Sequence, residues 1–282
     1  IMVACGGDTA EETVEEAAPE VVETLDSPAV TTASTVKTGV GVTSDPCPEV
    51  IGGIPTGADP SKGCIYLGLL NDYTGPFGPY GIPLETGQRG FWLWANQSGG
   101  IGDYSVAIIE GYDTQYNPQK HLEGYKAIRG EVAALAMSLG TPQTQFILDD
   151  MDADNMIAAP MSWYSGWSYK SSDRGLVVEF GAAYCADGMN AVDWAMANLP
   201  VDIKTIGVMG YAGDYGGDYA AGIRVAAEAN GLEVAWEYIV PSTEFDVAQA
   251  VGLMVTKPVD AYFPAIGPTF MAQVAGGAFQ QG

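Results

Sequence analysis

From residue 64 onward, apolar and polar residues alternate in two different rhythms. Short apolar runs such as 65–70 have the length and the flanking turn residues of buried β-strands. Longer stretches such as 84–97 place apolar side chains, Phe91, Leu93 and Trp94 among them, at helical spacing. The pattern predicts strands at 65–70, 104–110, 132–139, 156–159, 176–180, 205–209, 233–239 and 261–264, and helices at 84–97, 118–129, 143–149, 183–197, 215–230, 245–256 and 269–279.

Strands that alternate with helices of this length form parallel sheets with right-handed crossovers. Two such series, joined near 163–174, predict an α/β protein of two lobes, each a parallel sheet flanked by helices, with a cleft between them. We assign residues 50–165 to the first lobe and 166–282 to the second. Ligands bind beyond the carboxyl ends of the strands in open α/β sheets, so the residues that follow each strand are the candidates for a site.

The segment before residue 50 lacks this alternation. Between Asp8 and Glu49 it carries ten acidic residues and a single cation, Lys37, and it has no aromatic residue. Such a stretch buries too little apolar surface to offset its chain entropy. Residues 6–49 are therefore predicted to form a disordered acidic tether, which anionic lipid would repel.

The chain begins with the letters IMVACGG. Small and apolar residues ahead of Cys5, with glycines after it, resemble the lipobox of bacterial lipoproteins, in which the cysteine is lipidated and begins the mature protein. Residues 1–5 are then the end of a signal peptide. This interpretation predicts a protein outside the cytoplasm that is anchored to the membrane through lipid on Cys5. The alternative is an ordinary cysteine near the terminus.

Composition narrows the possible partners. The formal net charge is −24, from 11 Lys and Arg against 35 Asp and Glu, so the clustered cations that nucleic-acid binding needs are lacking. Hydrophobic residues make up 47% of the chain, which fits a largely globular protein. No apolar run reaches the roughly 18 residues of a membrane-spanning helix.

The four cysteines stand in two kinds of context. Cys47 and Cys64 bracket a loop rich in Gly, Pro and Asp, which predicts a disulfide in an oxidising compartment; the alternative is two unrelated thiols. Cys185 lies in an apolar helical stretch, which favours a buried thiol over a nucleophile.

Four motifs then occur in an order that resembles a known family. They are YTGPFGPYG at 73–81, ANQSGGI at 95–101, YDTQYNP at 112–118 and GDYG at 213–216. Together they are similar to the type I periplasmic binding proteins, and more narrowly to the leucine/isoleucine/valine-binding group. The resemblance covers roughly residues 64–280.

The resemblance implies a Venus-flytrap receptor that has no cofactor and no chemistry of its own. Such a receptor is monomeric, captures a small polar ligand between its lobes and delivers it to an ABC permease in the membrane. A sensory receptor of the same fold, feeding a signalling partner, is the alternative. Family members are usually longer, because the chain crosses back to complete the first lobe. We therefore expect this sequence to be truncated at both ends and its first lobe to be incomplete.

Two loops of the first lobe hold the charged end of the ligand in this family. Hydroxyl groups and backbone N–H groups at a helix amino terminus suit a carboxylate. The alternative role for Thr141 is to cap the next helix. Tyr80 and Tyr215 match aromatic positions that contact the ligand from the first and second lobes. The loop residues that the resemblance assigns to ligand binding are Thr141, Gln143, Thr144, Ser162 and Trp163.

One departure from the family pattern concerns the second lobe. In amino-acid binders an acidic residue there neutralises the ammonium of the ligand, but aligning on Phe245 puts Ser242 at that position. Glu244 substitutes only if the loop runs differently. A buried ammonium needs a paired anion, so an amide, a urea-like compound or a carboxylate is an alternative to an amino acid. The aromatic segment 163–167 either narrows the pocket or packs the hinge.

Other motifs lack essential parts. The single histidine, His121, is predicted on a surface helix. The sequence therefore has too few histidines for a histidine-rich metal site and hardly supports a serine–histidine triad. The segment 150–155 begins like a calcium loop, yet it has no glycine at the sixth position and Met161 at the twelfth. The glycines at 213–217 have neither the spacing nor the lysine of a phosphate loop.

Overall fold

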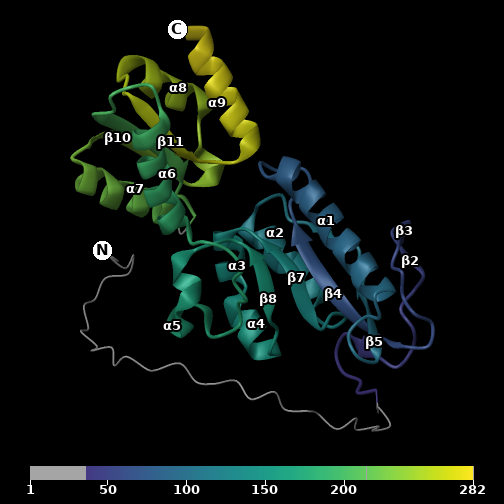
Figure 1. Ribbon diagram of the computed structural model, residues 1–282. Coiled ribbons are helices and arrows are strands. Elements are labelled where there is room, and N and C mark those ends of the chain that lie inside the picture. The colour runs from purple at the N-terminus through teal and green to yellow at the C-terminus, as the bar shows by residue number, and fades with distance from the viewer. Residues whose placement is uncertain (1–35, 214, 282) are drawn as a thin grey trace, which may run out of the picture.

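The computed structural model describes residues 36–213 and 215–281, and the main strands of this part form two separate sheets (Figure 1). The first sheet is centred on β4 (Gly63–Asn71). Its apolar run is buried on both faces, as expected for a central strand. Around β4 lie the parallel strands β5 (Tyr104–Ile108), β6 (Tyr112–Asp113), β7 (Ala134–Leu139) and β8 (Ala158–Met161), and the antiparallel β1 (Val42–Thr43).

Helices cover both faces of the first sheet. Neighbouring β4 residues point to opposite faces, so that Leu69 packs in the core on the α1 side and Leu70 in the core under α2 and α4. The tight turn after β4 leads directly into α1, which begins six residues earlier than the periodicity predicts. The helices are α1 (Gly78–Gln97), α2 (Pro118–Ile128), α3 (Thr141–Phe146) and α4 (Leu148–Asp154).

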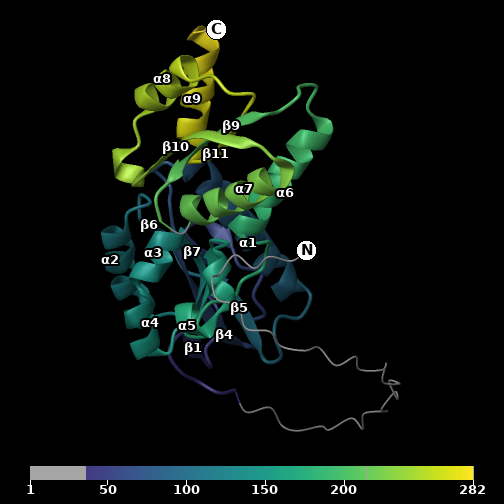
Figure 2. The same cartoon turned by 90° about the vertical axis from the view of Figure 1, so that its left-hand side faces the viewer.

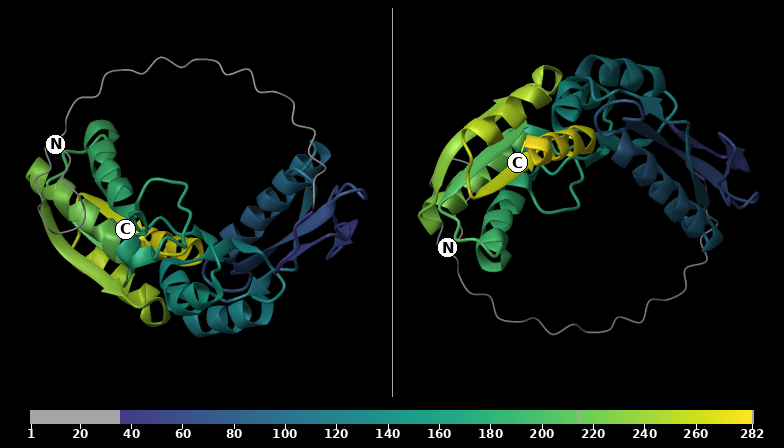
Figure 3. Two further views of the ribbon diagram at one scale, coloured as in Figure 1. Left: turned by 90° about the horizontal axis from the view of Figure 1, so that it is seen from below. Right: turned by 90° about the horizontal axis from the view of Figure 1, so that it is seen from above.

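The second sheet has the order β10-β9-β11, and all of its strands are parallel. Its strands are β9 (Thr205–Tyr211), β10 (Glu233–Val240) and β11 (Ala261–Ala265). One face packs on α6 (Tyr184–Asn198) and α7 (Gly216–Asn230), and the other packs on α8 (Val247–Thr256) and α9 (Pro268–Gln281). The short η2 (Ser242–Glu244) precedes α8. The second lobe lies above the first in Figure 2, and the two lobes lie side by side in both views of Figure 3.

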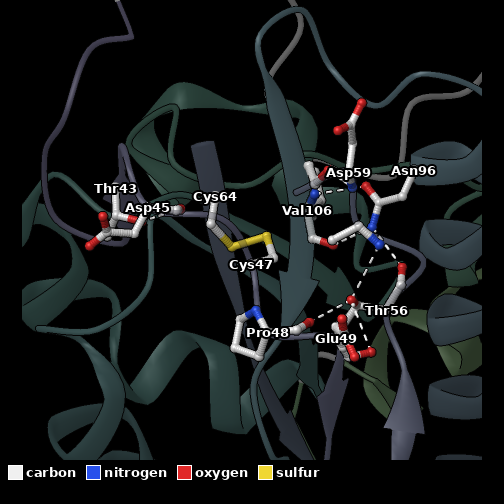
Figure 4. Close-up of a disulfide and its surroundings, with 12 residues drawn as sticks. Thr43, Asp45, Cys47, Pro48, Glu49, Thr56, Asp59, Cys64, Asn96 and Val106 are labelled. Atoms are coloured by element: carbon white, nitrogen blue, oxygen red, sulfur yellow. Dashed lines mark hydrogen bonds between the residues drawn. A yellow bond between two sulfur atoms is a disulfide. The ribbon is translucent and has the colours of Figure 1, made fainter. Parts of the chain in front are cut away.

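The first lobe begins earlier in the chain than the sequence predicts. Residues 36–49 were expected to belong to the tether, but β1 pairs with the start of β4, and Cys47 forms a disulfide with Cys64 (Figure 4). The hydroxyl group of Thr56 donates to the carbonyl oxygen of Pro48 at 2.6 Å. The disulfide and these backbone contacts attach a segment that its own composition would leave loose. The hairpin of β2 (Val50–Ile51) and β3 (Ile54–Pro55) follows.

The crossing between the lobes also differs from the prediction. Residues 176–180 were expected to form the first strand of the second lobe. Instead, Val177 bridges to Ala158 at the edge of the first sheet, and Leu176 and Val177 pack into the core under α2 and α4. The segment between β8 and this bridge contains η1 (Ser165–Ser168) and α5 (Lys170–Asp173). The first lobe therefore extends to about residue 180 and the crossing lies just before α6.

Two further sequence predictions concern cysteines and the membrane. Cys185 is buried in α6, as the sequence predicts. The prediction of a free thiol is wrong, because Cys185 is not free. Cys5 and the predicted signal peptide lie outside the described residues. Within the described part of the chain, no helix combines the length and hydrophobicity that crossing a bilayer requires.

Candidate binding site between the lobes

A cavity of about 460 Å³ lies where the two lobes meet, at the carboxyl ends of the strands of the first sheet. This volume is within the usual range for a small-molecule site. Residues that follow β4, β6, β7 and β8 line one side, and the amino-terminal ends of α6 and α7 line the other. The lining residues are Phe77, Tyr80, Pro83, Leu84, Tyr116, Leu139, Gly140, Met161, Trp163, Tyr184 and Tyr215.

Aromatic rings from both lobes form most of the cavity wall. The rings of Phe77 and Tyr116 in the first lobe have centroids 4.3 Å apart. Tyr215 at the start of α7 lies 6.0 Å from Phe77 and 4.9 Å from Tyr184 in edge-on geometry. Trp163 lies 6.1 Å from Tyr184. Such edge-on and tilted pairs fix the rings and leave an apolar space between them.

Two carboxylates hold the loop that carries Phe77. Asp72 is fully buried at the end of β4 and accepts hydrogen bonds from the backbone N–H groups of Gly75 at 2.5 Å and Phe77 at 2.8 Å. Burial raises the pKa of Asp72, although these hydrogen bonds oppose the rise. Asp113, at the end of β6, accepts from the N–H of Tyr73 at 3.0 Å and from the hydroxyl of Thr74 at 2.7 Å.

Two buried hydroxyl groups lie next to residues of the cavity wall, since Thr141 follows Gly140 and Ser162 lies between Met161 and Trp163. Thr141 Oγ1 lies 2.5 Å from Ser162 Oγ, which accepts a hydrogen bond from the indole of Trp167 at 2.9 Å. Both hydroxyls are buried directly behind the lining residues. Burial raises the pKa of Tyr184, and hydrogen bonds with the backbone of Trp163 and the side chains of Thr141 and Ser162 oppose the rise. The phenol of Tyr184 in the cavity wall is thus close to Thr141 and Ser162.

The cavity is electrically neutral where the structure describes it. None of the described lining residues is Asp, Glu, Lys, Arg or His. Burial also raises the pKa of Tyr116 and Tyr215 well above that of a free phenol, so both rings are uncharged at physiological pH. The polar groups that this site offers a ligand are thus neutral donors and acceptors.

The residues that the sequence assigns to ligand binding fall into three positions. Trp163 and Tyr215 line the cavity, and Tyr80 lines its rim with half of its surface exposed. Thr141 and Ser162 form the hydroxyl cluster behind it. The three other assigned residues, Gln143, Thr144 and Ser242, are not part of the lining.

Thr144 has a structural setting in a buried polar row. Its Oγ1 lies 2.7 Å from Ser138 Oγ and donates to the carbonyl oxygen of Gly140 at 2.9 Å. The row continues to His121, whose Nε2 is 2.9 Å from Ser138 Oγ. His121 was predicted on a surface helix, but it is fully buried, because α2 turns its face with His121, Tyr125 and Ile128 toward the sheet.

Phe77, Tyr116 and Tyr184 line the cavity but were not identified from the sequence. Phe77 and Tyr116 stand inside the quoted motifs, directly after β4 and β6, so the rule of strand ends pointed at them. Tyr184 lies four residues beyond the predicted strand at 176–180. Its role depends on how α6 meets the first lobe, for which the sequence carries no local signal.

The aspartates of the rejected calcium loop form ion pairs on the surface. Asp154 contacts Arg129 at 3.1 Å and Asp152 contacts Arg174 at 3.3 Å. Within the described residues no cluster of His, Cys, Asp or Glu suits a metal ion.

Comparison with known proteins relates this geometry to characterised folds. The sequence model of a family described as "Periplasmic binding protein" matches residues 64–282. A search of curated proteins gives no match.

Several solved structures share the fold. A fatty acid ABC transporter substrate-binding protein from Thermomonospora curvata matches with a TM-score of 0.69 and 29% identity, over 81% of this chain and 58% of its own. A solute-binding protein from Rhodopseudomonas palustris BisB5, in complex with 3,4-dihydroxy benzoic acid, matches with a TM-score of 0.62 and 19% identity over 76% and 58%. A branched chain amino acid ABC transporter protein from Thermus thermophilus with bound valine matches with a TM-score of 0.61 and 15% identity, over 74% of this chain and 54% of its own. The present chain thus spans a little over half the length of these structures.

Proposed function

The chain belongs to the periplasmic binding protein family, and from this premise we propose that it is the solute receptor of an ABC-type uptake system outside the cytoplasm. Its ligand is a small monocarboxylate with an aromatic or aliphatic body, which it delivers to a membrane permease. The carrying observation is the cavity with its aromatic walls, beside which the hydroxyl groups of Thr141 and Ser162 are buried next in the chain to the lining residues Gly140 and Trp163.

The aromatic walls select the body of the ligand. Apolar surface gains free energy when it leaves water for such a space, and flat rings can stack on Phe77, Tyr116 or Tyr184. Urea and simple amides have little apolar surface to bury. An α-amino acid is disfavoured for a second reason, because its ammonium would meet no anion among the described lining residues.

The hydroxyl cluster selects the polar end. A carboxylate that reaches Tyr184 would meet its phenol hydroxyl as a donor, with the buried hydroxyls of Thr141 and Ser162 close behind it. Hydrogen bonds to an ionised acceptor are stronger than those between neutral groups, so such donors can hold an anion without a cation beside it. The protein that binds 3,4-dihydroxy benzoic acid and the one named for a fatty acid support a carboxylate ligand for this fold.

Isothermal titration calorimetry on the complete chain tests the ligand class. The panel contains 3,4-dihydroxybenzoate, benzoate, octanoate, valine and urea. We expect saturable binding of at least one of the three carboxylates without an ammonium, and none of valine or urea. Binding of valine or urea with no binding of these carboxylates would overturn the ligand assignment.

A phenol-to-phenyl substitution tests the polar end of the cavity. Tyr184→Phe keeps the ring but removes the hydroxyl that lies close to Thr141 and Ser162. We expect carboxylate affinity to fall roughly tenfold, as for the loss of one hydrogen bond to a charged group. Tyr169→Phe, on an exposed tyrosine that does not line the cavity, is the matched control. Equal affinities of the two variants would contradict the role of Tyr184.

Anchoring at the membrane is a separate part of the proposal. Lipid on Cys5 would keep the receptor near its permease, and the lipobox-like residues ahead of Cys5 support this. Metabolic labelling with a radioactive fatty acid tests it in cells that express the complete gene. The label should be present on the wild type and absent from Cys5→Ser. Equal labelling of both would refute lipidation at this residue.

A further inference from the structure

The cavity residue Tyr116 sits in an unfavourable backbone conformation. Its φ angle is 52° and that of the preceding Gln115 is 53°, so two consecutive residues with side chains occupy the left-handed region. Single residues other than glycine visit this region rarely, because the Cβ crowds the following carbonyl. Such a conformation persists only where neighbouring groups hold it. Tyr116 is nevertheless 5% exposed, with its ring against Phe77 in the cavity wall.

Gln143 supplies one of the groups that hold this turn. Its side chain is 1% exposed on α3, and its Nε2 donates to the backbone carbonyl of Tyr116 at 2.8 Å. The orientation of the amide follows from chemistry, because only the NH₂ end can donate to a carbonyl oxygen. The Oε1 end is buried without a hydrogen-bond partner among the described residues. A buried acceptor without a partner is unfavourable, so a feature other than full hydrogen bonding keeps this amide here.

The opposite end of the same side chain packs against Gly140. This glycine has a φ angle of 105°, and the carbonyl group of Gln143 occupies the space that a Cβ would need. Gly140 and Tyr116 both line the cavity. The Gln143 amide therefore contacts two lining residues, Gly140 and Tyr116, that follow different strands.

We propose that Gln143 is a positioning residue, which fixes the ring of Tyr116 and thereby sets the affinity of the cavity for aromatic ligands. The inference rests on the proposed function, since it names a determinant of ligand recognition at the same site. Gln143 acts through Tyr116 and does not touch the ligand. Without its hydrogen bond the turn relaxes from the left-handed region, and the ring leaves its place beside Phe77.

Hydrogen exchange of the ligand-free protein, followed by mass spectrometry, tests the first step without any ligand. Gln143→Met keeps a similar volume but has no donor. We expect faster exchange in the peptide that covers 112–118 and unchanged exchange in the second lobe. Gln145→Met, on the same helix and partly exposed, is the control and should leave that peptide unchanged. Equal exchange of Gln143→Met and wild type would overturn the proposal.

A double-mutant cycle tests the second step. Binding of 3,4-dihydroxybenzoate is measured on wild type, Gln143→Met, Tyr116→Ala and the double variant. We expect Gln143→Met alone to weaken binding about fivefold to tenfold, the range of one lost hydrogen bond. In the Tyr116→Ala background the same change should cost less than about twofold, because coupled residues are not additive. Equal effects in both backgrounds, or no effect of Gln143→Met, would overturn the proposal.

The two hypotheses fail in different ways. If wild type binds none of the carboxylates, the proposed ligand class falls, whereas the exchange measurement still decides whether Gln143 holds the turn. If Gln143→Met does not fold, Gln143→Asn takes its place in both experiments. Its amide is one methylene too short to reach the carbonyl of Tyr116.

Discussion

His121 is an ionisable side chain with no access to water. It lies on the inner face of α2, its Nε2 contacts Ser138, and its Nδ1 has no partner among the described residues. Burial lowers the pKa of His121 to about 3, because a charged imidazolium would lose its hydration. In the unfolded chain the same group titrates near 6.5.

This difference predicts a loss of stability in mild acid. As the pH falls below about 6.5, His121 is protonated in the unfolded state, whereas it stays neutral in the folded state down to about pH 3. The free energy of unfolding should therefore fall by up to about 1.4 kcal/mol per pH unit in this range through His121 alone. Urea unfolding of wild type and His121→Gln between pH 7 and pH 5 measures how the free energy of unfolding depends on pH. The variant should show a shallower pH dependence, and parallel curves would disprove the effect.

The individual residues of the site were partly accessible from the sequence. Thr141, Ser162 and Trp163 follow strands and match a family pattern, and the structure has them at or behind the cavity wall. The burial of His121 was visible in principle, since residues 121, 125 and 128 share one helical face. The left-handed turn at Tyr116 could not be predicted, because glycine normally marks such a turn and the sequence has Gln115 and Tyr116 there.

At the scale of elements, the position of the segment 36–49, called the strap below, depends on a covalent bond. Cys47 and Cys64 lie 17 residues apart, and their disulfide joins the strap to the start of β4. Closing a loop of this length removes conformational entropy from the unfolded chain. It also keeps β1, a strand of only two residues, beside the sheet.

Removing this disulfide should therefore destabilise the first lobe. For the double variant Cys47→Ala/Cys64→Ala we expect the free energy of unfolding to fall by roughly 3 kcal/mol. Limited proteolysis should also cleave the strap before the rest of the lobe. Differential scanning calorimetry and mass spectrometry of the fragments measure both effects. An unchanged melting profile with an intact strap would show that β1 pairing alone is sufficient.

Most helices and strands were predictable because their apolar spacing is regular. The segment 176–180 shows the limit of this signal. The predicted strand is not formed, and only Val177 bridges to the edge of the first sheet. The apolar run specifies neither a full strand nor the sheet that it contacts. Pairing of Val177 with Ala158 is decided by packing against the first core, a tertiary effect without a local code.

At the scale of the whole molecule, a side-chain carboxylate links the lobes. Asp218 on α7 accepts hydrogen bonds from Ser165 in the first lobe, at 2.9 Å from the backbone N–H and at 2.6 Å from the hydroxyl. Asp218 is 9% exposed, so water competes little for these bonds. The contact favours the arrangement in which residues of both lobes line one cavity.

Breaking this contact should weaken ligand binding without any change in the cavity itself. For Asp218→Ala we expect carboxylate affinity to fall about threefold to tenfold, because the binding-competent arrangement becomes less populated. Small-angle X-ray scattering should show a larger radius of gyration. Asp202→Ala removes a carboxylate from an exposed surface pair and is the control. Unchanged affinity and radius for Asp218→Ala would mean that the link does not govern the arrangement of the lobes.

The two-lobed α/β architecture was predictable from the order of the elements, but the complete aromatic wall of the cavity was not. Its aromatic wall is assembled from residues as distant in sequence as Phe77 and Tyr215, and their rings meet only after both lobes have formed. Local patterns report burial and spacing. They do not report which aromatic side chains will face one another across a cleft.

The position of Trp163 has one more consequence. Of the described tryptophans, it is the one that lines the cavity. Indole emission responds to the polarity around the ring, so arrival of a ligand should change the intensity or wavelength of the protein's own fluorescence. Trp163→Phe should abolish this signal while the other indoles continue to emit. If the chain serves as a solute receptor, as proposed, its own fluorescence would report whether the cavity is occupied.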